Sequence, residues 1–328
     1  MPVWTGRRVL VTGAGGFIGS HVTERLVGAG APVRALLRYT SNASRGWLEG
    51  STAGDSVEAF FGDVCDRDVL ARAMRGVDVV FHLAALIGIP YSYEAPASYV
   101  RTNIEGTLAV LQAAAAAGVR RVVHTSTSEV YGTPRGVPIP EDHPLQPQSP
   151  YAASKAAADL IAAAFHKSFG LEVATIRPFN TYGPRQSLRA VIPTIISQAL
   201  SGPAIKLGHV APTRDFTFVS DTVDAFIAMG TAEKVDGLVV NVGSGKEISI
   251  GALAELIQSI TRTSWPVVSE DVRARPPASE VDRLCADASR ARTLLGWAPQ
   301  HVLRDGLART VEWIVEHRDR YRTADYRV

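Results

Sequence analysis

The sequence predicts an α/β protein with a doubly wound parallel sheet and a smaller C-terminal α/β lobe. Short apolar segments alternate with longer helical segments through the first half of the chain, which is typical of parallel strands and crossover helices. A glycine-rich turn follows the first of these strands and opens the first helix. The alternation stops near residue 180. We therefore expect residues 1–180 to form the sheet domain and residues 181–328 to form mainly the smaller lobe, with a strand near 239–244 rejoining the sheet.

The composition excludes several classes of protein. The 328 residues include 34 basic and 32 acidic side chains, and a net charge of +2 offers no field for nucleic acid and no polybasic patch for a membrane. The N-terminus is too short and polar for a signal peptide, and no apolar run approaches the ~18 residues of a membrane span. We expect a cytoplasmic protein. Cys65 and Cys285 lie far apart without metal-binding or redox spacing, so no metal is expected.

The first strand, expected at residues 8–12, leads into a run of glycines and then a helix from about residue 20 to residue 29. Residues without a Cβ let backbone N–H groups at a helix N-terminus approach a pyrophosphate. Because these glycines stand between a strand and a helix, they indicate a dinucleotide site more strongly than a merely tight turn. The residues expected at the pyrophosphate are Gly13, Gly16, Phe17, Ile18 and Gly19.

The end of the second strand, at residues 33–37, favours one form of the cofactor over the other. A cofactor with a free ribose 2′-OH usually meets Asp or Glu at this point, whereas here the residue is Arg38. A guanidinium suits a 2′-phosphate better than a hydroxyl, so the sequence slightly favours NADP over NAD. Arg38 could equally stack on the adenine or face solvent.

The following strand ends also contribute expected cofactor contacts. Asp63 is a candidate for the adenine edge, with loop capping as the alternative. The fourth strand, at residues 78–85, contains His82 in an apolar run, which we interpret as a core histidine with satisfied ring nitrogens. The other residues expected beside the cofactor are Val64, Leu83, Ala84 and Ala85.

Two alanine-rich helices are expected at residues 108–117 and 151–169, on either side of a strand at 119–125 and an irregular loop at 132–150 that contains six prolines. Smooth apolar helices of this kind usually pack on other helices. They could form the seam of a homodimer, which we expect, although burial within one chain explains their composition equally well.

Tyr151 and Lys155 are four residues apart and therefore share one face of the second helix. A free tyrosine has a pKa near ~10. A neighbouring ammonium, helped by an oxidised nicotinamide, would stabilise the phenolate and make it a general base near neutrality. With the Thr127 hydroxyl holding the substrate alcohol, the group would oxidise a secondary alcohol and pass hydride to the nicotinamide.

The second half of the chain has a less regular pattern. Strands are expected at residues 173–177, 213–219 and 239–244, and residues 202–208 are rich in turn formers. Helices are expected at residues 192–200, 250–260, 289–295 and 303–321.

Motifs along the whole chain resemble those of the extended short-chain dehydrogenase/reductases, in the branch of NAD-dependent nucleotide-sugar epimerases and dehydratases. The matching segments are residues 12–19, 126–132, 151–155, 177–184, 214–216, 241–244, 275–276 and 294–299. The resemblance implies a Rossmann domain with tightly bound NAD(P), a nucleotide-sugar-binding C-terminal lobe, and Thr127, Tyr151 and Lys155 as the catalytic triad. It places Pro178 at the cofactor. The residues that it places at the nucleotide sugar are Ser92, Asn180, Arg185, Val191, Arg214 and Arg275, with Asn180 and the three arginines at the diphosphate.

Within this family Glu129 favours the sugar 4,6-dehydratases. A 4-keto group acidifies H5, a carboxylate can remove it, and loss of water across C5 and C6 leaves an enone that takes hydride back at C6. The dehydratases of deoxysugar pathways place Asp before this Glu, to protonate the leaving hydroxyl. Here Ser128 stands in its place, so Glu129, a relayed water or the loop must supply the proton.

The resemblance is greatest to 4,6-dehydratases of N-acetylglucosamine nucleotides, so a UDP- or GDP-linked N-acetylhexosamine is the expected substrate. A nucleotide-sugar 4-epimerase is the first alternative and a UDP-glucuronate decarboxylase the second. A redox-sensing binding protein that holds the cofactor without chemistry is an alternative of another class. Such proteins typically lose the helix tyrosine or lysine, and this chain has both.

Overall fold

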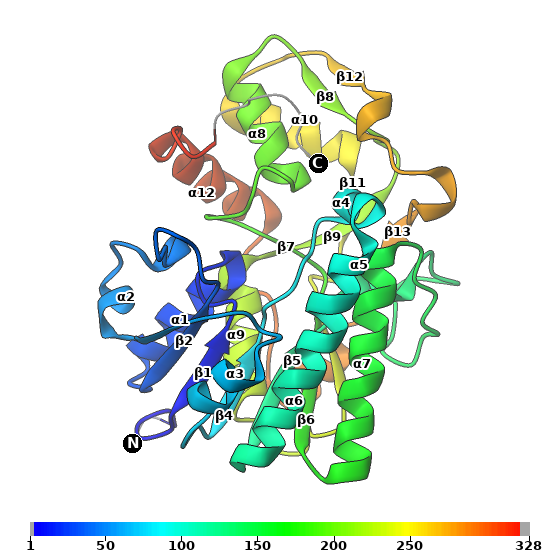
Figure 1. Cartoon of the computed structure of the whole chain (residues 1–328). Coiled ribbons are helices and arrows are strands. Elements are labelled where there is room, and N and C mark those ends of the chain that lie inside the picture. The colour runs from blue at the N-terminus through cyan, green and yellow to red at the C-terminus, as the bar shows by residue number, and fades with distance from the viewer. Residues whose placement is uncertain (1–2, 322–328) are drawn as a thin grey trace.

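The computed structural model describes residues 3–321, and Figure 1 shows a large sheet covered by helices with a smaller lobe above it. The large sheet has seven strands in the order β10-β6-β5-β4-β1-β2-β3, and every neighbouring pair is parallel. The predicted doubly wound fold is confirmed. The strands are β1 (Val9–Thr12), β2 (Val33–Leu37), β3 (Glu58–Phe61), β4 (Val79–His82), β5 (Arg121–Thr125), β6 (Glu172–Pro178) and β10 (Val239–Val242).

Helices bury both faces of this sheet. Alternate residues of β1 belong to different cores: Val9 and Val11 pack with α1 and α9, and Leu10 packs with α3 and α6. Strands buried on both faces read as continuous apolar runs, which is why the sequence pattern identified them. The helices on this sheet are α1 (Phe17–Gly28), α2 (Thr52–Ser56), α3 (Arg67–Ala73), α6 (Gly106–Ala117), α7 (Pro150–Phe169), α9 (Val219–Met229) and α11 (Ser289–Leu295).

The smaller lobe is built from two small sheets and three helices. Strand β9 (Thr213–Phe218) pairs with β7 (Asn180–Tyr182), β11 (Glu247–Ser249) and β13 (Arg283–Leu284), and β8 (Ile205–Leu207) pairs with β12 (Val267–Ser269). The helices are α8 (Val191–Ser201), α10 (Ile250–Thr261) and α12 (Leu303–Glu316). Short helical segments complete the fold: α4 (Ile89–Glu94), α5 (Pro96–Tyr99), a π-helix η2 (Val100–Glu105), and 3-10 turns η1 (Gly46–Leu48), η3 (Ser128–Tyr131), η4 (Asp271–Arg273) and η5 (Pro277–Ser279).

The structure differs from the predicted elements where distant segments meet. The turn-rich residues 202–208 contain β8, which forms only because β12 lies beside it more than fifty residues later in the chain. Helix α9 was not predicted, and α12 ends at Glu316, before the expected boundary at residue 321. The chain thus leaves the large sheet after β6, returns to it with α9 and β10, and leaves it again with β11. Within residues 3–321, every helix is too short or too polar to cross a membrane.

Candidate active site

The carboxyl end of β5 continues into three polar residues that the fold holds in place. Thr127 caps the η3 turn, because its Oγ1 accepts the N–H of Glu129 at 3.3 Å. The same side chain is hydrogen-bonded to the phenol of Tyr151. Ser128 and Glu129 are both buried. The Thr127 hydroxyl is therefore fixed between the turn and the phenol, as a group that positions a substrate alcohol requires.

Helix α7 brings the phenol and the amine to this strand end. Ser149 caps the helix by accepting the N–H of Ala152 at 3.1 Å, and Pro150 occupies its first turn. Tyr151 then lies in the first turn and Lys155 one turn later on the same face. The Lys155 Nζ donates to the carbonyl of Thr125 at 2.5 Å, which joins α7 directly to β5.

Burial controls the protonation of both side chains. It lowers the pKa of Lys155 to about 8, and the charge of Asp159 partly offsets this effect. Burial also raises the pKa of Tyr151 well above its ordinary value; the hydrogen bond with Thr127 acts in the opposite direction, and the nearby Glu129 carboxylate adds to the rise. A phenol that is a base near neutrality was expected from the sequence. Without the oxidised nicotinamide on which that expectation also depends, burial and the Glu129 carboxylate favour the protonated phenol.

A buried network behind Lys155 was not predicted. The carboxylate of Asp159 accepts hydrogen bonds from His124 Nε2 at 3.1 Å, from Ser126 Oγ at 2.6 Å, and from Arg177 Nη2 at 2.8 Å. All four side chains are buried. The sequence contains one signal that could have indicated it: Asp159 is the lone acidic residue in an alanine-rich helix, one turn after Lys155.

The π-helix η2 ties the loop after β4 to the catalytic helix. Asn103 donates to the Leu86 carbonyl and to Ser154 Oγ, both at 2.9 Å, and accepts the Leu86 N–H at 2.8 Å. Just before η2, the ring of Tyr99 packs edge-on against Tyr151 at 6.2 Å. Single π-turns are frequent at functional sites. This one fixes the surroundings of the phenol from the side opposite β5.

The glycine turn after β1 fits a dinucleotide pyrophosphate. Gly13 has a φ of +70°, and a Cβ on Gly19 would lie 2.1 Å from the Gly13 carbonyl oxygen, so side chains are excluded at both positions. No side chain caps the N-terminus of α1 at Gly16, which leaves the N–H groups of Phe17 and Ile18 available to an anion. A nicotinamide dinucleotide bound here would supply a hydride acceptor and, when oxidised, the positive charge that Tyr151 lacks.

Gly19→Ala is expected to destabilise the protein by at least about 1–3 kcal/mol, because its Cβ meets backbone that cannot move aside. Binding of NAD should weaken in parallel. Gly28→Ala is the matched control on the same helix, since a Cβ there contacts nothing within 4 Å, and it should be neutral or stabilising by up to about 1 kcal/mol. Thermal unfolding and a cofactor titration measure both effects, and equal behaviour of the two variants would contradict the steric account.

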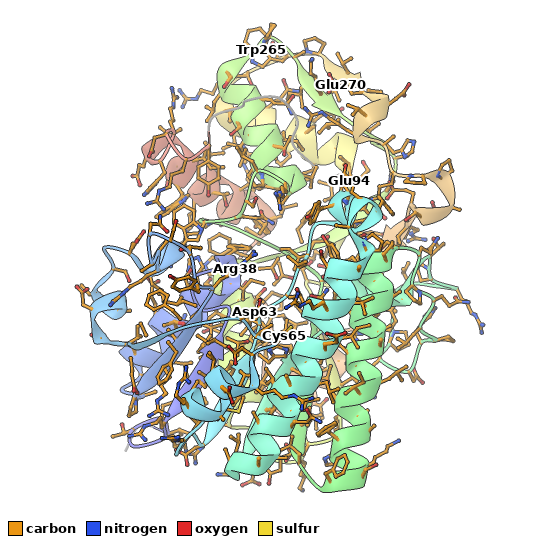
Figure 2. The ribbon with its side chains drawn as sticks, in the orientation of Figure 1. Arg38, Asp63, Cys65, Glu94, Trp265 and Glu270 are labelled. Carbon is orange, nitrogen blue, oxygen red and sulfur yellow. The ribbon has the colours of Figure 1, made fainter. Side chains whose placement is uncertain are left out.

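The residues expected at the adenosine half lie on adjoining strand ends. The N–H of Gly62 donates to the Leu37 carbonyl at 2.9 Å, which places Asp63 next to Arg38, and Figure 2 shows the two side chains near one another. Arg38 is exposed, with no hydrogen bond or ion pair among residues 3–321. Asp63 Oδ1 accepts the N–H of Cys65 at 2.8 Å, so this carboxylate caps its own loop.

The end of β4 runs alongside the glycine turn. The N–H groups of Leu83 and Ala84 both donate to Thr12 Oγ1 at 3.1 Å, so this hydroxyl must donate its own proton to His82 Nδ1, 2.8 Å away. His82 then carries its proton on Nε2 and donates to Thr107 at 3.1 Å. Burial lowers the pKa of His82 well below its usual range. The predicted core histidine is confirmed as neutral and satisfied at both nitrogens. Of the remaining expected contacts, Val64 is buried, and Ala85 and Pro178 are half-buried.

Two of the three arginines expected at a diphosphate lie together, beside Glu129. Arg275 Nη1 is 3.7 Å from Glu129 Oε1 and 3.7 Å from Glu280 Oε1, and Arg214 Nη2 is 3.0 Å from the same Glu280 oxygen. Arg275 Nη1 is buried without a hydrogen-bond partner in the described chain. Two guanidinium groups and two carboxylates are therefore clustered here, and Arg275 Nη1 forms two long ion pairs but no hydrogen bond with the described residues. Sequence reasoning missed Glu280.

The third arginine is elsewhere. Arg185 forms a bidentate ion pair with Glu24 of α1, at 2.9 and 3.0 Å, and donates to Ser20. It has a φ of +73°, which turns the chain back towards α1 after Pro184. The expectation that Arg185 joins Arg214 and Arg275 is not met.

The other residues expected at the sugar nucleotide have mixed surroundings. Ser92 is fully buried, and its hydroxyl donates to the Ile89 carbonyl at 2.7 Å, so the structure does not present it to a ligand. Asn180 is half-buried at the start of β7, with a long contact of 3.4 Å to the Asp215 carbonyl, and Val191 is half-buried at the start of α8. In the described part of the chain, no group of three or more His, Cys, Asp and Glu side chains could hold a metal ion.

Comparison with known proteins agrees with this geometry. A family model described as GDP-mannose 4,6 dehydratase matches residues 10–310. The chain is 39% identical to a dTDP-glucose 4,6-dehydratase of Streptomyces griseus, over 94% of each protein, and 38% identical to a UDP-glucose 4-epimerase of Mycolicibacterium smegmatis, over 93% of this chain and 98% of the relative. The solved dTDP-glucose 4,6-dehydratase of Streptomyces venezuelae, with NAD bound, superposes with a TM-score of 0.88 at 34% identity, over 95% of this chain and 98% of that one.

Proposed function

The chain belongs to the extended short-chain dehydrogenase/reductase family of nucleotide-sugar dehydratases and epimerases, and on that premise we propose that it is a nucleotide-sugar 4,6-dehydratase. One observation carries the choice: the buried carboxylate of Glu129 follows Thr127 on the η3 turn and acts electrostatically on the Tyr151 phenol. A 4-epimerase needs one base at O4. A dehydratase needs a second base at C5, and Glu129 is in place for it.

The chain's own residues have separate roles in the proposed reaction. Thr127 orients the C4 hydroxyl, and Tyr151 takes its proton while the C4 hydrogen leaves as hydride. Lys155, as an ammonium, favours the phenolate form of Tyr151. Glu129 then removes H5 and returns this proton to the hydroxide that leaves C6, so that water is lost; hydride is added back at C6, and a proton from solvent is added at C5.

The substrate of the proposed reaction is a nucleotide-linked hexose whose diphosphate binds Arg214 and Arg275. Support comes from the pair of guanidinium groups beside Glu129 and from Arg275 Nη1, which makes no hydrogen bond with the described residues. For the sugar we propose an N-acetylhexosamine linked to UDP or GDP, on the likeness of the β5 and β6 motifs. The relatives in hand act on glucose nucleotides by their names, so these substrates are the comparators.

A 4-epimerase is the second candidate, because Ser128 occupies the position where dehydratases of deoxysugar pathways carry an aspartic acid. Ser128 is buried, and a hydroxyl is a poor acid for a leaving group. If the chain is an epimerase, Glu129 serves only as the partner of Arg275.

A mass-spectrometric assay in deuterium oxide tests the function directly. UDP- and GDP-linked N-acetylglucosamine, glucose and glucuronate are supplied together with dTDP-glucose. Loss of one water mass with one deuterium retained in the sugar is the expected result. An unchanged mass with inverted C4 and no deuterium would show a 4-epimerase, and loss of carbon dioxide from the glucuronate would show a decarboxylase.

For the cofactor we propose tightly bound NAD(P), with NADP favoured because Arg38, at the end of β2, has no hydrogen bond or ion pair with the residues that the structure describes. Arg38→Ala should weaken NADP binding by about 10- to 150-fold, the effect of losing a charged hydrogen bond of about 1.5–3 kcal/mol, and leave NAD binding unchanged. Arg72→Ala, which removes another exposed arginine, is the control. Cofactor titrations in which Arg38→Ala weakens both forms equally, or neither, would contradict the preference.

We further propose a homodimer formed through α6 and α7, which lie side by side over one face of the sheet (Figure 1). Leu160, near the middle of α7, is 64% exposed, and Ala153 and Ala164 on the same helix are also exposed. Leu160→Lys should convert the dimer to a monomer in sedimentation velocity, whereas Leu238→Lys, which changes an exposed leucine elsewhere, should not. A wild-type monomer at micromolar concentration would contradict the proposal.

A further inference from the structure

We propose that Asp159 is a positioning residue that keeps the buried Lys155 side chain charged and docks the catalytic helix on the end of β5. The inference rests on the roles proposed above for Tyr151 and Lys155. It does not depend on which sugar nucleotide is the substrate.

The contacts of Asp159 join three elements. His124 on β5 and Ser126, the first residue after this strand, both donate to the carboxylate. On β6, Arg177 donates to Asp159 Oδ2 from Nε at 3.1 Å and from Nη2 at 2.8 Å. Asp159 and Lys155 are one turn apart on α7. The carboxylate thus fixes α7 against the end of β5, two residues before Thr127.

The network continues away from the site, which holds Arg177 in place. Its Nη1 donates to the Tyr131 hydroxyl at 2.9 Å, and that hydroxyl donates to Asn241 Oδ1 at 2.8 Å. Asn241 lies on β10, so strands from both halves of the chain support the ion pair. A carboxylate held by three partners cannot move to follow Lys155 and is a fixed charge beside it.

Asp159 is ionised, and its charge is the one that raises the pKa of Lys155, whereas the Glu129 carboxylate acts on Tyr151. Although burial acts to raise the pKa of Asp159, the hydrogen bond from His124 and the charge of Arg177 lower it overall. The charged or titratable groups that face Lys155 and Asp159 are His82, His124, Glu129, Tyr151 and Arg177. Burial lowers the pKa of both histidines, so they are neutral, and Arg177 is already paired.

The position of Lys155 makes the counter-charge necessary. Its ammonium is 4% exposed and donates to one carbonyl, and burial has already reduced its pKa to about 8. Without Asp159 the pKa would fall further, and above that lower value the amine would be neutral. A neutral amine cannot stabilise the Tyr151 phenolate.

The test measures the titration of Lys155 directly. The chain has five lysines, so isotope-labelled lysine gives a simple NMR spectrum in which the Lys155→Met variant assigns one signal. The lysines are Lys155, Lys167, Lys206, Lys234 and Lys246. Asp159→Asn is expected to lower the titration midpoint of Lys155 by about one pH unit or more. Tyr131→Phe removes hydrogen bonds of the same network but no charge, so it should leave the titration midpoint of Lys155 unchanged.

A double variant distinguishes the effect of the Asp159 charge on Lys155 from a loss of protein stability. Asp159→Asn alone leaves the Arg177 charge buried and unpaired, which is strongly destabilising. Combining Asp159→Asn with Arg177→Met removes both charges of the buried ion pair. The double variant should regain thermal stability and still show the lowered midpoint. If its Lys155 titrates as in the wild type, Asp159 is only a structural residue and the inference is wrong.

Kinetics distinguish this inference from the proposed function. The probe is UDP- or dTDP-glucose, and the measurement is the rate of single-turnover reduction of the bound cofactor. As the pH rises, this rate should begin to fall at a lower pH in the double variant than in the wild type. If the wild type reduces no cofactor with any sugar nucleotide, the proposed function fails, while the lysine titration still decides the role of Asp159.

Discussion

Replacing Tyr151 by phenylalanine is expected to lower the rate of alcohol oxidation by about 10²- to 10⁴-fold, because the variant lacks the group that takes the hydroxyl proton. The ring of Tyr151 packs against Tyr99, and phenylalanine keeps that contact, so the fold should survive. The measurement is single-turnover formation of the reduced nicotinamide absorbance after addition of sugar nucleotide.

The matched control removes a phenol outside the site. Tyr182 is buried, and its hydroxyl donates to the Leu303 carbonyl at 3.1 Å in the smaller lobe. Tyr182→Phe should lower thermal stability slightly and leave the oxidation rate intact. If Tyr151→Phe oxidises substrate as fast as Tyr182→Phe, another group is the base.

Glu129→Gln is expected to spare the oxidation step and to stop exchange of H5, lowering the overall rate of water loss by about 10²- to 10⁴-fold. The amide preserves the shape of the side chain but cannot take a proton. The oxidation step is measured as reduced cofactor formed in a single turnover. The exchange of H5 is measured as deuterium incorporated at C5 in deuterium oxide. Reduced cofactor should accumulate, since the enone that would take back the hydride no longer forms.

Glu280→Gln provides the control for the charge of Glu129. Both carboxylates lie 3.7 Å from Arg275, but the phenol of Tyr151 is affected by Glu129 and not by Glu280. Glu280→Gln should therefore change KM through the arginines and leave H5 exchange in place. Full turnover by Glu129→Gln would show that the dehydratase mechanism is wrong.

The parts of the fold that local sequence determines were predictable. Each strand of the large sheet coincides with a short apolar run, including β10, which was expected to rejoin the sheet, and the glycine turn and the Tyr151–Lys155 pair depend on spacings of a few residues. The core role of His82 also follows from its place in an apolar run.

The parts that depend on distant contacts were not predictable from these patterns. Arg185 binds Glu24 across more than a hundred residues, and nothing local distinguishes it from Arg214. Glu280 and Asp159 have roles only because other segments bring arginines to them. The raised pKa of Tyr151 has the same origin: it reflects burial by α5 and η3, whereas the helix spacing alone suggested only a helpful lysine.

The return of the chain to the large sheet constrains how the protein is made. Helix α9 covers the apolar face of α1, and β10 pairs with β6, yet both elements follow the first strands of the smaller lobe. A ribosome that has released only the first 180 residues leaves Val22 and Leu26 of α1 without the helix that buries them, and one strand edge without its neighbour. The sheet is therefore complete only after residue 242 has emerged, and until then an apolar helix face and the free edge of β6 are open to association with other chains.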